Sequence, residues 1–304
     1  MLPADSRLVM PVLAAGGGSG RSTVAGLLAC SLAASAATVV LDTAYRLASP
    51  WPTWPTKPGA GLASVPPDQG MTPAQVRAAA SRCSGPDGDW QVLTDHQEWS
   101  APPLPLPSDP AAWYQLAAAG GWQAVIADTA HPIAHDVVTS RTLNLSGLTA
   151  GWCALPYSVP VIAAPATGPG VAALQMAVRA ASAEGLPLAR MVVALVETGD
   201  GRPPAVARAA ATMLQSQVSG VVQMPFDPHI RARGLGDAHR LISRKTREAT
   251  AALVSAVLAS AHRTWGEPLP AAPVPAGTAR PGVAPPAASL LAQNDPHPQE
   301  GVLA

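Results

Sequence analysis

The sequence has few aromatic residues apart from tryptophan and almost no lysine. Its 304 residues include one Phe, three Tyr and eight Trp, so alanine, valine and leucine must fill the interior. Lysine occurs only at Lys57 and Lys245, among 19 basic residues. Because 19 acidic residues balance these, no net charge draws the whole chain to nucleic acid or to a membrane surface. Binding of that kind would need a local patch of charge.

Cysteine is also scarce. The three cysteines, Cys30, Cys83 and Cys153, lie far apart and form no CxxC motif. An odd number without close spacing excludes a disulfide framework and argues against a zinc or redox site. We therefore expect buried, incidental thiols and a protein of the reducing cytoplasm.

Short apolar runs alternate along the chain with longer segments that read as helices. This alternation predicts an α/β fold: a three-layer sandwich with a mostly parallel sheet and helices on both faces. The predicted strands are Leu8–Leu13, Ala37–Asp42, Trp90–Asp95, Trp122–Asp128, Val159–Pro165, Ala189–Val196 and Gly220–Asp227. The predicted helices are Ser22–Ser35, Ala74–Arg82, Pro110–Ala119, Val171–Ala183, Pro203–Gln215 and Ala238–Arg263.

A glycine-rich stretch, "AGGGSGRST" over Ala15–Thr23, separates the first predicted strand from the first predicted helix. A phosphate-binding loop needs this layout, since glycines let backbone N–H groups close on an anion that faces a helix N-terminus. Asp42 and Asp128 each end a predicted strand, where ligands bind in open parallel sheets. Two acids beside such a loop suit an Mg²⁺–nucleotide site. A flexible glycine turn is the alternative.

Two segments bear on the extent of the folded domain. Ser22–Leu41 carries no charge and could be read as a signal peptide or membrane span, but its Ala, Ser, Gly and Thr content makes it weakly hydrophobic for a bilayer. From residue 267 the chain is dense in proline and alanine. We expect a domain over 1–266 and a disordered tail over 267–304. This tail lacks a basic amphipathic helix, so we expect no direct membrane insertion.

Taken together, these segments resemble the MinD/ParA family of P-loop ATPases, whose deviant Walker A motif reads roughly xKGGxGK[ST]. "AGGGSGRST" aligns with that motif, and "VVLD" matches the strand that ends in the family's A′ aspartate, here Asp42. "WQAVIADTAHP" is similar to the Walker B strand, with Asp128, and "VVQMPFDPHIRARG" is similar to the late strand and loop over the adenine. The resemblance implies a P-loop NTPase fold, ATP or ADP with Mg²⁺, and homodimers that sandwich the nucleotide.

The resemblance also implies roles for individual residues. Asp42 and Arg21 would be catalytic, and Pro225 would lie over the base. Ser22 would bind Mg²⁺ through its hydroxyl, and Asp128 would hold the metal through water. The residues expected to bind the nucleotide are Gly16, Gly17, Gly18, Ser19, Gly20, Arg21, Ser22, Thr23 and Pro225.

Three positions depart from the family pattern. Arg21 stands at the Walker lysine, Gly16 at the signature lysine that reaches the partner's phosphates, and Ala44 at the second acid of an Asp-x-Asp run. Charge placement dominates phosphoryl transfer, so these changes should weaken hydrolysis more than binding. We therefore expect a nucleotide-binding scaffold or localisation factor with weak or no hydrolysis. The alternative is a slow ATPase for positioning or partitioning that binds DNA non-specifically.

Other features leave alternatives open. An unidentified protein of a secretion, conjugation, pilus or partition system is the expected partner. The basic cluster over 231–247 could bind DNA or form a solvated face. The Trp/Pro-rich stretch Ser49–Pro58 could be a partner surface or pack on the domain. His131 and His135 are expected to be switch-region residues rather than metal ligands, and Glu197 lies where a family member reads the base with Asn.

Overall fold

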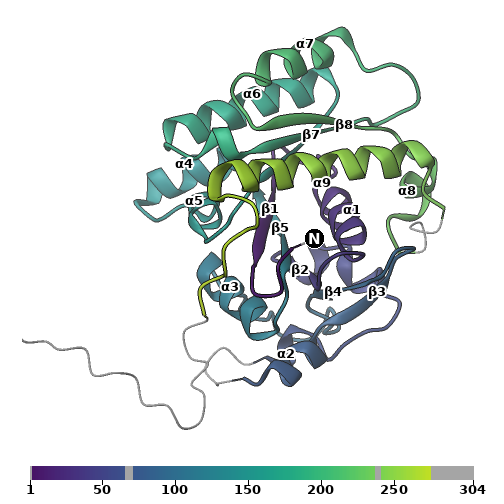
Figure 1. The fold of residues 1–304 in the computed structure, drawn as a ribbon, viewed down its shortest axis with the longest axis vertical. Coiled ribbons are helices and arrows are strands. Elements are labelled where there is room, and N and C mark those ends of the chain that lie inside the picture. Colours follow the sequence, from purple (N-terminus) through teal and green to yellow (C-terminus); the bar gives the residue numbers. More distant parts are fainter. Residues whose placement is uncertain (1, 66–70, 237–240, 275–304) are drawn as a thin grey trace, which may run out of the picture.

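The computed structural model describes residues 2–65, 71–236 and 241–274 (Figure 1). An eight-stranded sheet runs through it, with strand order β3-β4-β2-β5-β1-β6-β7-β8. β3 pairs antiparallel with β4, and the other neighbouring strands pair in parallel. The strands are β1 (Leu8–Ala14), β2 (Thr38–Asp42), β3 (Ser81–Ser84), β4 (Asp89–Leu93), β5 (Ala124–Pro132), β6 (Val161–Pro165), β7 (Val192–Val196) and β8 (Gly220–Met224).

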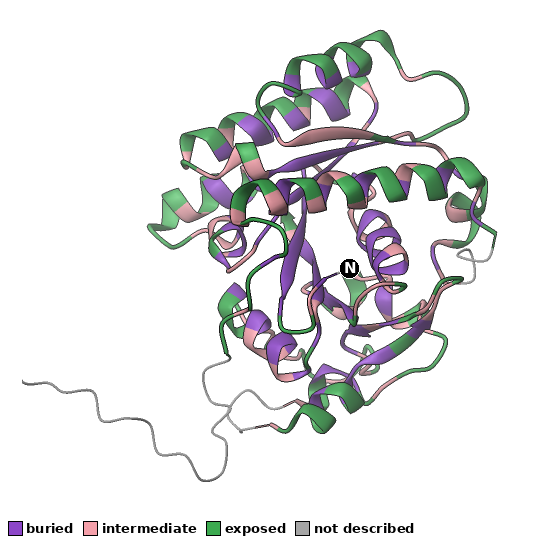
Figure 2. Ribbon diagram, viewed as in Figure 1, coloured by how far each residue is buried: buried purple, intermediate pink, exposed green. Residues whose placement is uncertain are grey.

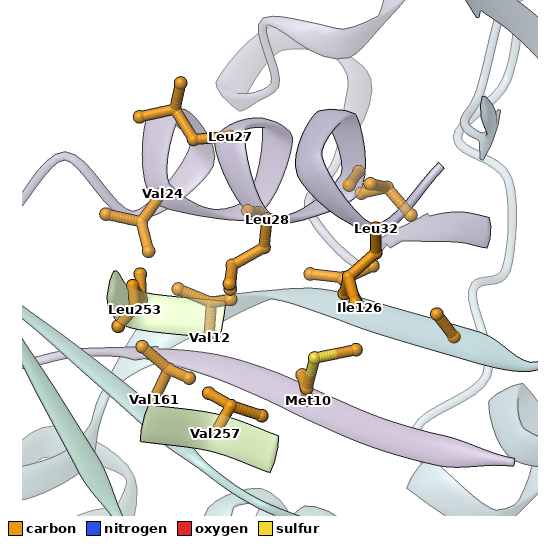
Figure 3. Packing of buried hydrophobic residues seen from close by; sticks show 14 of the residues in the cluster. Met10, Val12, Val24, Leu27, Leu28, Leu32, Ile126, Val161, Leu253 and Val257 are labelled. Atoms are coloured by element: carbon orange, nitrogen blue, oxygen red, sulfur yellow. The ribbon is translucent and has the colours of Figure 1, made fainter. Parts of the chain in front are cut away.

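Helices cover both faces of this sheet, which confirms the predicted three-layer α/β fold. In β1, Met10 and Val12 join a core cluster with the helices α1 and α9, whereas Val9 and Leu13 point into clusters on the opposite face. Figure 3 shows the first of these clusters, in which Val24 and other residues of α1 face the strands. The helices are α1 (Arg21–Leu32), α2 (Pro73–Ala79), α3 (Pro110–Ala119), α4 (Ile133–Leu143), α5 (Leu148–Ala154), α6 (Gly168–Ala183), α7 (Ala205–Leu214), α8 (Pro228–Arg233) and α9 (Arg244–Trp265).

The central strands are buried on both faces, as Figure 2 shows by their colour. Every residue of β1 and β2 is buried. A strand covered by helices on both sides needs apolar residues throughout and shows no period-two alternation, so these segments read as continuous apolar runs. Several small residues of α1 are buried, among them Ala25 and Ala29, whereas Gly26 leaves room for the side chains of Leu235 and Trp51.

The structure differs from the predicted elements at one sheet edge and in three helices that were not predicted. The helix predicted from Ala74 ends at Ala79, and the chain continues into β3, whose polar sequence "SRCS" contains no apolar run. The last long helix begins at Arg244, where the Ser243 hydroxyl caps it by accepting a hydrogen bond from the Thr246 backbone N–H. The sequence reading also missed α4, α5 and α8.

The segment read as a signal peptide or membrane span forms α1 and β2 inside the fold. Among the described residues, no helix combines the length and apolar character that a bilayer crossing requires. Ordered contacts continue beyond the predicted domain boundary at residue 266. Leu269 is 2% exposed, and the Ala272 N–H donates to the carbonyl oxygen of Asp5 at 2.8 Å. The predicted disorder of the rest of the tail falls on residues 275–304, which lie outside the described residues.

The approach of α6 to β6 generates a stability prediction. A Cβ atom on Gly170 would lie 2.2 Å from the backbone carbonyl oxygen of Pro165, whereas a Cβ on Gly168 would meet nothing within 4 Å. We expect Gly170→Ala to lower the free energy of unfolding by about 2 kcal/mol, because the backbone must shift to admit the methyl group. The matched variant Gly168→Ala should leave stability unchanged or slightly raised. Denaturant unfolding measures both, and equal effects would contradict the close approach.

Candidate functional site

The glycine-rich loop joins β1 to α1 at the carboxyl end of the sheet. Gly18 and Gly20 have positive φ angles of 66° and 76°, a conformation that residues with a Cβ rarely adopt. Gly20 is the N-terminal cap of α1 and provides no side-chain oxygen, so the first N–H groups of the helix lack a side-chain cap. Such free N–H groups at a helix N-terminus favour an anion.

A cavity of about 430 Å³ lies against this loop. Its walls include Ala14 and Ala130 from the ends of β1 and β5, together with Pro50 and Trp54 from the Trp/Pro-rich stretch. All the loop residues expected to bind nucleotide contribute to it: Gly16, Gly17, Gly18, Ser19, Gly20, Arg21, Ser22 and Thr23.

A second cavity of about 250 Å³ shares Gly18, Gly20 and Thr23 with the first. Pro225, expected over the base, lines this second cavity. Glu197 lines it too, and one of its carboxylate oxygens accepts a hydrogen bond from the Phe226 N–H at 3.4 Å. The two cavities therefore meet at the same three loop residues.

The two predicted acids lie next to each other. Asp42 at the end of β2 and Asp128 in β5 are direct partners in the parallel register, and each is 1% exposed. Buried carboxylates need hydrogen bonds or a counter-charge to offset lost solvation, and adjacent ones also repel each other. The surrounding residues determine which of the two carries the charge.

Asp128 is paired with a cation from the loop. Arg21 donates from Nε to Oδ1 of Asp128 at 2.6 Å, and the arginine side chain is 17% exposed. The second oxygen, Oδ2, accepts a hydrogen bond from the indole Nε1 of Trp51 at 2.7 Å. Both oxygens of the acid that was expected to hold Mg²⁺ through water are therefore engaged by protein donors.

Asp42 is held by hydroxyl groups instead of a cation. Ser49 Oγ and Thr94 Oγ1 both donate to its Oδ2 at 2.6 Å, and the Ala44 N–H donates to Oδ1 at 3.2 Å. The pKa of the Asp42 carboxyl is raised from 3.8 to about 7, mainly by burial and to a smaller extent by the negative charge of Asp128, although these three hydrogen bonds act in the opposite direction. Asp42 is therefore a group that exchanges a proton near neutral pH.

One short segment supplies donors to both acids. Ser49 contacts Asp42 and Trp51 contacts Asp128, and the Trp51 N–H also donates to Ser49 Oγ at 3.1 Å. The Trp51 ring is fully buried and meets the rings of Trp54 and Trp90 edge-on, at centroid distances of 4.9 and 5.8 Å. This part of the Trp/Pro-rich stretch therefore packs on the domain, which is one of the two alternatives for it.

The sequence reading did not identify Ser49, Trp51 or Thr94 as site residues. For Ser49 and Trp51 the only signal was the Trp/Pro-rich stretch after the second strand, which does not indicate which side chain points inward. Thr94 lies in the predicted strand Trp90–Asp95 and had no signal of its own. The structure places the other two departures from the family pattern, Gly16 and Ala44, as the sequence indicated. Gly16 lies in the loop without a side chain, and Ala44 is buried two residues after Asp42.

The two predicted switch-region histidines and Arg244 of the basic cluster line neither cavity. His131 and His135 stack on each other with ring centroids 6.1 Å apart, and no group of three metal-ligating side chains occurs among the described residues. In the basic cluster, Arg244 pairs with Glu248 at 2.7 Å, and Arg231 lines the second cavity. Arg240 lies outside the described residues. DNA binding by this cluster stays a prediction.

The raised pKa of Asp42 predicts a pH dependence of stability. The folded protein binds this proton more tightly than the unfolded chain does. Proton binding by Asp42 therefore makes its full contribution to the stability of the folded state at low pH. That contribution is lost as pH rises between about 4 and about 7. We expect the melting temperature of the wild type to fall by several degrees relative to Asp42→Asn over this range, as followed by thermal unfolding.

Asp227 provides a control of opposite sign. Burial acts to raise its pKa, but hydrogen bonds from the Ser243 N–H, Thr246 Oγ1, the His229 N–H and the Ile230 N–H outweigh it and lower the pKa. The wild type should therefore lose stability relative to Asp227→Asn as pH falls through the acid range. Parallel melting profiles for the wild type and Asp42→Asn would contradict the assignment of the raised pKa.

The bond between Trp51 and Asp128 predicts a difference between two tryptophan substitutions. Trp122 is equally buried, but its indole Nε1 donates to the neutral Gln91 Oε1 at 3.0 Å. Both Trp→Phe changes remove the same volume, but Trp51→Phe also leaves a charged acceptor short of a partner. We expect it to cost about 1 kcal/mol more than Trp122→Phe, since hydrogen bonds to charged groups are the stronger ones. Denaturant unfolding of the two variants gives this difference, and equal losses would refute it.

Comparison with known proteins finds similarity at the level of structure. No protein-family model matches the chain, and no curated protein matches its sequence. The ParA family ATPase from Chlorobium tepidum TLS is 14% identical, with a TM-score of 0.53 over 84% of this chain and 98% of that one. The cell division ATPase MinD from Pyrococcus furiosus is 14% identical, with a TM-score of 0.51 over 83% of this chain and 98% of that one.

A Cyanothece McdA–ATP complex is 15% identical, with a TM-score of 0.50 over 83% of this chain and 97% of that one. These likenesses span nearly the whole length of each solved structure, so they concern the complete sheet and its helices. The chain has the α/β fold of the ParA and MinD ATPases, in agreement with the resemblance of its loop and strand-end motifs.

Proposed function

We propose that the protein binds ATP or ADP at the loop Gly16–Thr23, hydrolyses it weakly or not at all, and acts as a scaffold or localisation factor for a larger machine. The observation that carries this proposal is a complete phosphate-loop cavity whose cation, Arg21, is committed to Asp128. The second cavity, lined by Pro225, has room for the base. Two of the similar structures are named as ATPases and the third is named as an ATP complex, which supports a nucleotide as the ligand.

The same geometry weakens the case for hydrolysis. A lysine at the loop would reach the β- and γ-phosphates as a compact point charge, whereas the guanidinium here is planar and its Nε is held by a carboxylate. Gly16 carries no cation to reach a partner's phosphates, and Ala44 offers no acid to orient water. The proposal includes two further features. The protein forms a homodimer, and its partner is a protein of a secretion, conjugation, pilus or partition system.

A slow ATPase is the second candidate, and one observation favours it. The pKa of Asp42 of about 7 suits a side chain that accepts a proton near neutral pH. Single-turnover measurement of phosphate release from ATP separates the two candidates. Release above the rate without protein, and its loss in Asp42→Asn, would favour the ATPase. A trace that matches the protein-free rate supports the binding protein.

Nucleotide binding itself can be tested with a pair of loop variants. A Cβ on Gly17 meets no atom within 4 Å, and Gly17 does not have a positive φ, so a side chain fits there without strain. Gly17→Glu would place a negative charge in the phosphate cavity and should weaken ADP binding by at least about tenfold, which is 1.4 kcal/mol. Gly17→Ala adds no charge and should bind within about threefold of the wild type.

Isothermal titration calorimetry with ADP and with ATP measures these affinities. Thermal unfolding of each variant shows that it is folded. Absence of a heat of binding at millimolar nucleotide in the wild type would overturn the proposal.

A further inference from the structure

The acid expected to hold a metal ion is paired with a cation of the protein itself. Arg21 Nε lies 2.6 Å from Oδ1 of Asp128, a carboxylate that is 1% exposed. An ion pair this short and this shielded from solvent satisfies the charge of Asp128 within the protein. Asp128 therefore has no uncompensated negative charge to offer a second cation.

A hydrated Mg²⁺ does not fit this arrangement. Its water shell would have to donate to Asp128, which is 1% exposed and whose oxygens already face the Arg21 guanidinium and the fully buried Trp51, so each metal-bound water would compete with an existing donor. A divalent ion beside the guanidinium would also be repelled by it in a region of low dielectric constant. Asp42 is no better placed as an anchor, because it is 1% exposed and both of its oxygens accept hydrogen bonds, Oδ2 from Ser49 and Thr94 and Oδ1 from the Ala44 N–H.

The guanidinium of Arg21 still has donors to spare. Its Nε is used by Asp128, whereas its two terminal nitrogens hydrogen-bond to none of the residues that the structure describes. Arg21 also lines the 430 Å³ cavity beside the loop glycines. A planar fork of donors can hold a carboxylate on one edge and a phosphate on another, which a lysine ammonium cannot do with the same geometry.

We propose that this site binds the phosphates of its nucleotide without a divalent cation, with the Arg21 guanidinium bridging Asp128 and the phosphate groups. This inference rests on the proposed nucleotide binding and concerns the nature of the bound species: free ADP or ATP rather than the Mg²⁺ complex. Ser22, expected as the metal's hydroxyl ligand, then contacts phosphate as a hydrogen-bond donor from the same cavity wall.

The test compares the affinity for ADP in EDTA with that in excess Mg²⁺, measured by isothermal titration calorimetry on the full-length chain. We expect binding in EDTA to be at least as tight as in Mg²⁺, or weaker by no more than about threefold. Weaker binding than that in EDTA would overturn the metal-free site while leaving nucleotide binding in place. Absence of binding in both buffers would contradict the proposed function itself.

Arg21→Lys tests the part assigned to the guanidinium. A shorter, compact cation should release Asp128 for a metal's water shell, so this variant should bind ADP at least about tenfold more tightly in Mg²⁺ than in EDTA. Equal affinities in the two buffers would show that the metal independence does not come from Arg21. Thermal unfolding checks that the variant is folded, and the comparison on the wild type stands without it.

Discussion

Asp42 and Asp128 are direct partners on neighbouring parallel strands, and neither has more than a trace of solvent contact. Two negative charges at this spacing in a buried place repel each other, and each also loses its hydration. The two acids have different partners, which reduces this repulsion. Asp128 forms an ion pair with Arg21, whereas Asp42 accepts hydrogen bonds from hydroxyl groups and has a raised pKa.

The loop keeps the backbone features that phosphate binding needs but differs from the family pattern in its cationic side chain. The backbone features of a phosphate loop are all present: positive φ at Gly18 and Gly20, a helix N-terminus without a side-chain cap, and an adjoining cavity. Backbone features of this kind depend on glycine and on chain direction, so they are independent of the nearby cation. The departure from the family pattern is in a side chain. Arg21 stands at the Walker lysine, and its planar guanidinium binds Asp128 through Nε, which a lysine ammonium cannot do with the same geometry.

Much of the fold could be predicted from the sequence because the sheet is covered on both faces. Continuous apolar runs marked β1, β2 and β5, and the segment order then required a parallel sheet. The edge strand β3 could not be found in this way, since an edge strand of four residues needs no apolar run. The loop and the two acids were also predictable, because glycine clusters and strand-end acids leave a local signature.

The partners of those acids left no such signature. Ser49 and Thr94 are common residues in unremarkable contexts, and their role depends on where β4 and the segment after β2 come together. Trp51 was visible as one of two tryptophans in a proline-rich stretch, but only tertiary packing decides that its indole N–H reaches a carboxylate. The same holds for Arg21, whose chemistry was evident from the sequence but whose pairing with Asp128 was not.

The segment that carries Ser49 and Trp51 has a further consequence. These two side chains contact different acids, and the Trp51 N–H donates to Ser49 Oγ, so the two contacts are linked through one hydrogen bond. Its displacement would remove one donor from each acid and uncover a large aromatic ring, whereas Thr94 and Arg21 would still donate to Asp42 and Asp128. One short segment therefore stabilises the buried carboxylates of two neighbouring strands at the same time.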